Sequence, residues 1–391
     1  MFKFDAQDYP YASKRHVVYA KNGMSCVGNP SGAAAGLKVL LKGGNAIDAA
    51  VAVACAQPVV EPTGNGLGAD CFALIWFKGK LYAINGSGPL PMAASIEELK
   101  KRGFESIPPY GVEPINVPGA VGGWMTMHER FGRLPLEDVM APAIDYAENG
   151  YPVSPNISRL WEEAFTIYSK YKDRPEFKGF FDTFCPNGTW MKPGEVFKSH
   201  DMAETLREIC RTKGESFYRG ELAQKMDAFM KEHNGFLRAE DLAKYHPEWV
   251  EPLKTNYRGY DVWEIPPNSH GITVLMALNI LKGFEFGERD TVDTMHKQIE
   301  AMKLAFVDTM EYVAEPSHMI VTSEQLLSER YAEDRRKLIK MDSALMPQVG
   351  DPRYSSTVYF ATADAEGNMV SMIQSNFRGF GSGIVLSLIH I

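Results

Sequence analysis

A polar loop of five residues, 364–368, lies between two β-like runs and limits how this part of the chain can fold. The runs cover 357–363 and 369–375 and predict an antiparallel hairpin. If the residues flanking the loop pair, counting outward in step brings Thr357 opposite Ser375. Directly opposed side chains have β-carbons about 4.5–5.5 Å apart, so the two hydroxyls would lie within hydrogen-bonding reach. A register displaced by a residue or two would separate them.

Helical periodicity occupies most of the chain before this hairpin. Two Ala-rich segments, 33–41 and 46–56, are separated by Gly43 and Gly44, where one helix ends before the next begins. Further helices are predicted at 120–131, 136–149, 157–171, 201–212, 221–233, 272–283 and 293–313, and a first hairpin with strands 72–77 and 80–84.

Charge and composition exclude some classes of function. The 391 residues carry a formal net charge of -8, which argues against a broad basic surface for nucleic acid. No apolar run approaches the roughly 18 residues that a membrane span needs, and the N-terminus has no signal-peptide core. The five cysteines show neither a CxxC pattern nor a disulfide framework, so we expect a reduced, cytoplasmic protein without a membrane partner.

Six ordered sequence blocks carry a family resemblance. They are GGNAIDAAVAVACAQPVVEPTGNGLGAD (43–70), NVPGAVGGW (116–124), FGRLPLEDVMAPAIDYAENGYPVS (131–154), YRGYDVWEIPPNSHG (257–271), LLSERYAEDRR (326–336) and DAEGNMVSMIQSNFRGFGSGI (364–384). Over nearly its whole length the chain resembles the γ-glutamyltransferase family of N-terminal-nucleophile hydrolases. The resemblance implies an α+β fold, a four-layer αββα sandwich. It also implies a large-subunit region at 1–356 and a small-subunit region that begins at 357–385.

The processing threonine of that family falls on Thr357, although this chain reads Thr-Val-Tyr where the family usually has Thr-Thr-His. In the precursor its hydroxyl would attack the Ser356 carbonyl, and water would hydrolyse the resulting ester. The freed Thr357 would carry its own base, because an α-amine has an ordinary pKa of about 7.7–8.0. No histidine, cofactor or metal is therefore required.

Other site residues follow from the same resemblance. Ser375 matches a hydroxyl that supports the nucleophile, and Asn376 and Arg378 are expected to help bind substrate. Family enzymes hold a substrate carboxylate with an arginine after the second strand of the first hairpin, but 85–91 (NGSGPLP) has none; Ser87 or Pro89 stands there. Either the substrate lacks that carboxylate, or another cation such as Arg378 binds it.

Three other patterns favour structural roles. Gly64, Gly66 and Gly68 follow a helix and precede a strand, the reverse of a dinucleotide-binding loop, and predict a tight turn that could line the active site. His296 and Glu300, four residues apart on a predicted helix, lack a second pair of metal ligands. Ser269 is typical of a helix entry.

The sequence thus predicts a self-processing amidohydrolase or acyltransferase that acts through a threonyl-acyl intermediate on γ-glutamyl compounds such as glutathione. The alternatives are an amidohydrolase for a non-glutamyl small amide, oxamate-like or acyl-lactam, and a non-catalytic, unprocessed scaffold or binding protein. The expected partners are a small-molecule amide and the chain's own small subunit, with a homodimer of heterodimers as one arrangement. Family chains continue beyond this point, so we expect 386–391 (LSLIHI) to be a non-native tail and part of the oxyanion site to be missing.

Overall fold

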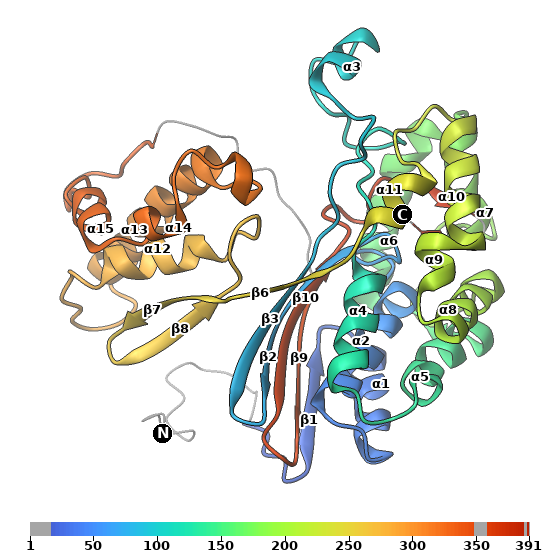
Figure 1. Ribbon diagram of the computed structural model, residues 1–391, viewed down its shortest axis with the longest axis horizontal. Coiled ribbons are helices and arrows are strands. Elements are labelled where there is room, and N and C mark those ends of the chain that lie inside the picture. The colour runs from blue at the N-terminus through green and yellow to red at the C-terminus, as the bar shows by residue number, and fades with distance from the viewer. Residues whose placement is uncertain (1–16, 348–357, 387–388, 391) are drawn as a thin grey trace.

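A six-stranded antiparallel sheet forms the centre of the computed structural model, which describes residues 17–347, 358–386 and 389–390 (Figure 1). The strand order is β1-β9-β10-β2-β3-β6, so the late hairpin is inserted between strands from the N-terminal part of the chain. The strands are β1 (Gly23–Val27), β2 (Asp70–Phe77), β3 (Lys80–Gly86), β6 (Glu248–Val250), β9 (Val358–Asp364) and β10 (Met369–Ser375).

The predicted hairpin register is confirmed for the described residues. β9 and β10 pair in step from Ala363 opposite Met369 to Val358 opposite Gln374. One further step of the same register leads to Ser375 and Thr357, but Thr357 lies outside the described residues. The hydroxyl pair therefore stays a prediction.

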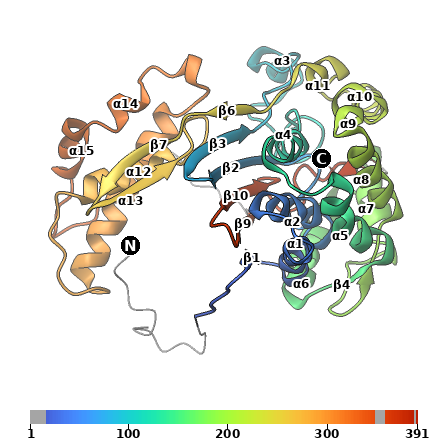
Figure 2. The same cartoon turned by 60° about the horizontal axis from the view of Figure 1, so that its bottom comes forward.

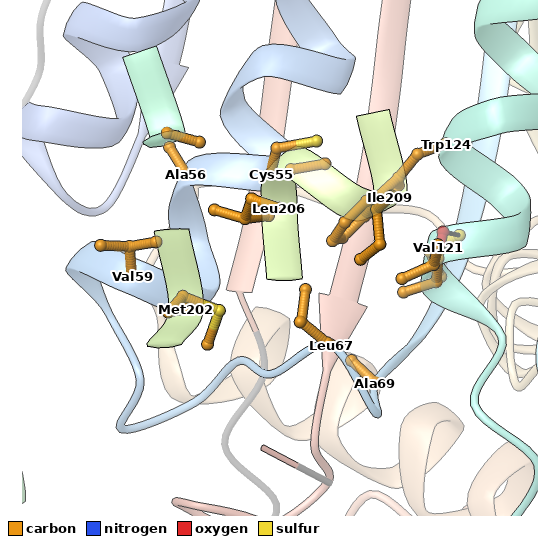
Figure 3. Packing of buried hydrophobic residues seen from close by; sticks show 14 of the residues in the cluster. Cys55, Ala56, Val59, Leu67, Ala69, Val121, Trp124, Met202, Leu206 and Ile209 are labelled. Carbon is orange, nitrogen blue, oxygen red and sulfur yellow. Dashed lines mark hydrogen bonds between the residues drawn. The ribbon is translucent and has the colours of Figure 1, made fainter. Parts of the chain in front are cut away.

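Helices cover one face of the sheet, and the innermost, α2 (Ala46–Val60), is buried along all 15 of its residues. Its sequence is apolar on every side, as a fully enclosed helix requires. Figure 3 shows Cys55, Ala56 and Val59 of α2 packed near Leu206 and Ile209 of α8. The other helices of this layer are α1 (Pro30–Leu41), α4 (Ala120–Phe131), α5 (Leu136–Asn149), α6 (Pro155–Tyr168), α7 (Lys178–Phe184), α8 (His200–Thr212), α9 (Glu215–Arg219), α10 (Glu221–Glu232) and α11 (Ala239–Lys244).

A second group of helices has its own small apolar cores and lies on the other side of the sheet in Figures 1 and 2. It contains β7 (Leu253–Tyr257), β8 (Tyr260–Glu264), α12 (Ile272–Leu281), α13 (Val292–Tyr312), α14 (Ser323–Leu326) and α15 (Glu329–Arg336). The remaining elements are α3 (Ile96–Lys101), β4 (Tyr151–Pro152), β5 (Val196–Phe197), β11 (Val385–Leu386) and β12 (Ile389–His390).

The α+β class is confirmed. Of the four expected layers, the described residues build one large sheet, the helices on one of its faces and the second helical group; their other strands form two-stranded sheets. None of the helices within these ranges is both long enough and apolar enough to cross a membrane.

The two faces of the sheet differ in burial. On β10, Val370, Met372 and Gln374 are buried toward the helices, whereas Met369 and Ile373 are 50% and 38% exposed on the opposite face. Side chains alternate along a strand, so Ser375 belongs to this open face. The predicted site residue therefore points away from the main core.

The turn of the hairpin is tied to the start of α2. The Asp364 carboxylate accepts hydrogen bonds from the backbone N–H groups of Ala46 (3.0 Å) and Asn368 (3.0 Å), and the Thr362 hydroxyl donates to the Ala46 carbonyl (2.6 Å). The Ala46 N–H is one of the donors that a helix N-terminus leaves without an intrahelical partner, and the helix dipole favours an anion there. Burial alone would raise the pKa of Asp364, but these hydrogen bonds outweigh it and hold the pKa below its ordinary value of 3.8.

We expect Asp364→Ala to lower the free energy of unfolding by about 1–3 kcal/mol, because it leaves buried N–H donors unsatisfied. A carboxylate whose folded-state pKa is depressed stabilises the fold above its unfolded pKa. The difference from wild type should therefore be complete above the ordinary value of 3.8 and shrink as the pH falls through the folded-state pKa.

Urea titrations of both proteins across this pH range test the expectation. Asp145→Ala is the control, because Asp145 is an exposed side chain whose nearest cation, Lys38 Nζ, is 4.0 Å away. A pH-independent loss of stability in Asp364→Ala would contradict the assigned role.

Candidate active site

The end of β10 brings together residues from three strands. Ser375 lies opposite Asp70, the first residue of β2, and the preceding residue, Gln374, lies opposite Val358 of β9. The Ser375 hydroxyl oxygen accepts a hydrogen bond from the Phe377 N–H at 2.8 Å. This bond fixes the direction of the hydroxyl at the strand end, where the sequence places its support for the nucleophile.

Gln374 anchors this end of the hairpin from the opposite face. Its side chain is fully buried; it accepts a hydrogen bond from Trp124 Nε1 (2.8 Å) and donates to the Ala54 carbonyl (3.3 Å) and to Asn65 Oδ1 (3.3 Å). These partners belong to α4, α2 and the loop that follows α2. The position of Ser375 is thus determined by the residue that precedes it.

A glycine-rich loop follows β10 and is held at several points. The Asn376 N–H donates to the Gly64 carbonyl (3.2 Å), and the Tyr168 hydroxyl donates to the Gly381 carbonyl (3.1 Å). Phe380 is fully buried against Trp161 and other aromatic rings. Gly379, Gly381 and Gly383 have φ values of 46°, 67° and 78°, which residues other than glycine rarely adopt.

The structure describes some of the other predicted site residues but not all of them. Thr357 and Ser356 lie outside the described residues. Asn376 and Arg378 are both in the loop after β10, and the Asn376 Nδ2 and Arg378 Nε atoms are buried without hydrogen-bond partners within the described structure. The Arg378 guanidinium lies 5.8 Å from the ring centre of Phe377. The Asn376 and Arg378 donors in the loop after β10 are therefore available to an acceptor atom of a bound ligand.

The region of the missing arginine forms a neutral polar cluster. The Ser87 hydroxyl donates to Asn85 Oδ1 (2.7 Å), Asn85 Nδ2 donates to Asn268 Oδ1 (2.8 Å), and Asn268 Nδ2 donates to the Ser87 oxygen (3.0 Å). The carbonyl of Pro89, the other residue considered for this position, accepts from the Val117 N–H at 3.0 Å. Hydroxyl and amide groups thus occupy the region in which the family resemblance predicts an arginine.

Asp70 and Gln374 were missed by the sequence reasoning. Asp70 is only partly exposed, and burial raises its pKa from the ordinary value of 3.8 to about 6; a hydrogen bond from its own backbone amide offsets only part of this. One signal was present for each: an acid that ends a glycine-rich loop, and an amide within an apolar strand.

The glycine pattern after α2 and the pair of His296 and Glu300 both have structural explanations. Residues 61–69 form a tight connection between α2 and β2, and Gly64 contacts the loop after β10 as described, so this segment borders the site. His296 Nε2 lies 2.8 Å from the Lys340 carbonyl, and Glu300 Oε1 lies 2.7 Å from Lys303 Nζ. Both side chains thus have contacts within the fold. Ser269 lies just before α12, whose N-cap is Gly271, and the Ser269 hydroxyl accepts from the Gly271 N–H (3.3 Å).

Among the residues that the structure describes, one surface group has the residue types of a metal site. Ligand atoms of Glu148, His200 and Glu204 lie within 4.8 Å of one another on α5 and α8. Glu148 is already paired with the Arg207 guanidinium at 2.6 Å. None of the three residues is among the residues that adjoin the end of β10 in the described structure.

Comparison with known proteins agrees with this geometry. A sequence profile described as gamma-glutamyltranspeptidase matches residues 32–388. The chain belongs to the gamma-glutamyltranspeptidase family. It is 36% identical over 357 residues to the glutathione hydrolase-like YwrD proenzyme of Bacillus subtilis, covering 90% of this chain and 66% of that protein. It is 33% identical to the acylase ACY 1 proenzyme of Pseudomonas sp. (strain SE83), covering 92% and 66%.

The fold is also shared with a solved structure. The crystal structure of cephalosporin acylase from Bacillus halodurans superposes with a TM-score of 0.93 and 55% identity, covering 100% of this chain and 72% of that one. The chain spans 66% of the length of both curated relatives. Relatives named as hydrolases and as acylases match this chain, so membership alone leaves the substrate open.

We expect Gln374→Met to lower the free energy of unfolding by about 1–3 kcal/mol, because it removes the partner of the buried Trp124 Nε1–H while nearly preserving volume. Chemical denaturation measures the change. The matched control is Ser371→Ala, on the open face of the same strand, which should remain close to wild type. Equal losses in the two variants would show that Gln374 has no special anchoring role.

Proposed function

We propose that Thr357 is the nucleophile of a self-processing amidohydrolase or acyltransferase. The Thr357 hydroxyl attacks the Ser356 carbonyl, the peptide bond gives way to an ester, and water hydrolyses the ester to leave a Ser356 carboxylate and a free Thr357 amine. The observation that supports this proposal is the β9–β10 register, which pairs Val358, the residue after Thr357, with Gln374, the residue before Ser375. The proenzyme names of two relatives also favour processing.

The same hydroxyl then acts on an external amide. The α-amine of Thr357 takes the hydroxyl proton, the oxygen attacks the amide carbonyl, and the amine of the substrate leaves from a threonyl-acyl ester. Water or an acceptor amine resolves the ester, which gives hydrolysis or transfer. The small subunit that begins at Thr357 stays with the large one, because β9 and β10 form the middle of its sheet.

The substrate class we favour is γ-glutamyl compounds such as glutathione, with Arg378 as the group that binds the carboxylate. The buried, unpaired Arg378 Nε supports this role. A second candidate is a non-glutamyl small amide, favoured by the neutral Ser87 cluster and by the acylase names among the relatives.

Self-cleavage separates the enzyme from a non-catalytic scaffold. On a denaturing gel the full-length protein should give two bands, the smaller beginning with Thr357. Thr357→Ala should give a single band and lose activity by at least about a thousandfold, whereas Thr357→Ser should still be cleaved. Ser371→Ala, a hydroxyl removed from the same sheet face, is the control. A single band for wild type, unchanged by Thr357→Ala, would support the scaffold.

Arg378→Ala should raise the KM for γ-glutamyl nitroanilide about tenfold with a smaller effect on kcat, because a charge-assisted contact to the carboxylate is lost. Arg378→Lys should recover only part of the loss, since an ammonium cannot form the bidentate pair. Arg159→Ala, an exposed arginine on α6, is the control. An unchanged KM in Arg378→Ala would eliminate this role.

A further inference from the structure

Glu61 ends the fully buried helix α2 and has no cation to match its charge. It is the C-cap residue of α2, and among the described residues it forms no ion pair. Burial raises the pKa of Glu61 above its ordinary value of 4.5, and the hydrogen bond that its carboxylate accepts from Gln57 Nε2 (3.1 Å) offsets only part of this. A desolvated carboxylate is unfavourable unless a cation or several donors approach it. Glu61 therefore carries an unmatched charge.

The position of Glu61 on the helix increases this cost. Carbonyl groups at the C-terminal end of a helix carry a partial negative charge, so a cation is favourable there and an anion is not. The last carbonyl of α2, that of Val60, accepts a hydrogen bond from Asn29 Nδ2 (2.8 Å), which is a neutral donor. Asn29 also caps the N-terminus of α1, where its Oδ1 accepts from the Ser31 N–H (2.9 Å). The positive end of α1 thus has an acceptor of its own, and Glu61 stays without a cation.

Two buried oxygen atoms near Glu61 have no hydrogen-bond partner in the described structure. One is Gln57 Oε1, which belongs to the fully buried amide whose nitrogen binds Glu61. The other is the Tyr151 hydroxyl, on a side chain that is 2% exposed. Besides burial, the charge of Glu61 raises the pKa of Tyr151, so each side chain lies within the field of the other. Buried polar atoms are nearly always paired, so these two oxygens point to a bound ligand.

The chemistry of these three side chains selects the ligand. A carboxylate, an amide oxygen and a phenol oxygen are hard oxygen donors, and the three side chains offer neither the sulfur nor the imidazole that zinc and copper favour. One carboxylate supplies one negative charge, so a monovalent ion neutralises the group, whereas a divalent ion would leave a buried positive charge. A water molecule could pair Gln57 and Tyr151 but would leave the charge of Glu61 unmatched.

We propose that Glu61, Gln57 and Tyr151 bind an alkali cation, sodium or potassium, at the C-terminal end of α2. The ion is a structural ligand and takes no part in bond cleavage. The assignment uses described residues alone and is independent of the proposed function of Thr357.

The same ion would stabilise the loop that borders the candidate site. The Glu61 carbonyl accepts a hydrogen bond from the Gly64 N–H (3.2 Å), and the Gly64 carbonyl accepts from the Asn376 N–H (3.2 Å). An ion on the Glu61 side chain therefore acts on the first residue of the segment that contacts the loop after β10.

Thermal unfolding of the full-length wild type in sodium, potassium and choline chloride at equal concentration tests the site. Choline is too large to enter between three side chains, and chloride is common to all three salts. We expect the unfolding midpoint in sodium or potassium chloride to exceed that in choline chloride by at least about 2 °C, because the ion binds only the folded state. The ²³Na NMR line of sodium chloride should broaden in the presence of the protein and narrow again when potassium chloride is added.

Glu61→Gln removes the charge with little change in shape and should abolish the difference between sodium and choline. In choline chloride this variant should be at least as stable as wild type, because it lacks the unmatched charge. Tyr151→Phe removes one oxygen ligand and should reduce the difference. Glu97→Gln, the same change at an exposed acid of α3, is the matched control and should keep it.

A wild type with the same midpoint in all three salts overturns the proposal, and this measurement needs no variant to fold. An alkali-dependent rise that is undiminished in Glu61→Gln would place the ion elsewhere and would also overturn it. Self-cleavage reports on Thr357 separately, so either proposal can fail while the other stands.

Discussion

The attachment of one hairpin to one fully buried helix determines the geometry of the candidate site. At the turn of the hairpin, Asp364 and Thr362 bind the first residue of α2. At the other end of the hairpin, Gln374 donates to the carbonyl of Ala54 in the middle of α2. Because α2 is enclosed on every side, it cannot shift without opening the core. The hairpin is therefore held at both ends, and the strand pairing converts that restraint into a fixed place for Ser375.

This arrangement leaves the open face of the sheet free for chemistry. The residues that hold β10, Val370, Met372 and Gln374, all point toward the helices, while Ser375 points the other way. Side chains alternate along a strand, so packing on the helices and exposure on the open face belong to different residues. Residues on the open face can therefore change without altering the packing face.

Local features of the sequence predicted much of this fold. The register of β9 and β10 followed from the length of one loop, and the bounds of α4 and α5 followed from periodicity, because these depend on residues close in the chain. Asp70 and Gln374 could not be found in the same way. The role of Gln374 depends on Trp124 and Ala54, and the raised pKa of Asp70 depends on burial by elements distant in sequence. The nucleophile itself came from family resemblance, since a threonine that opens a strand is ordinary.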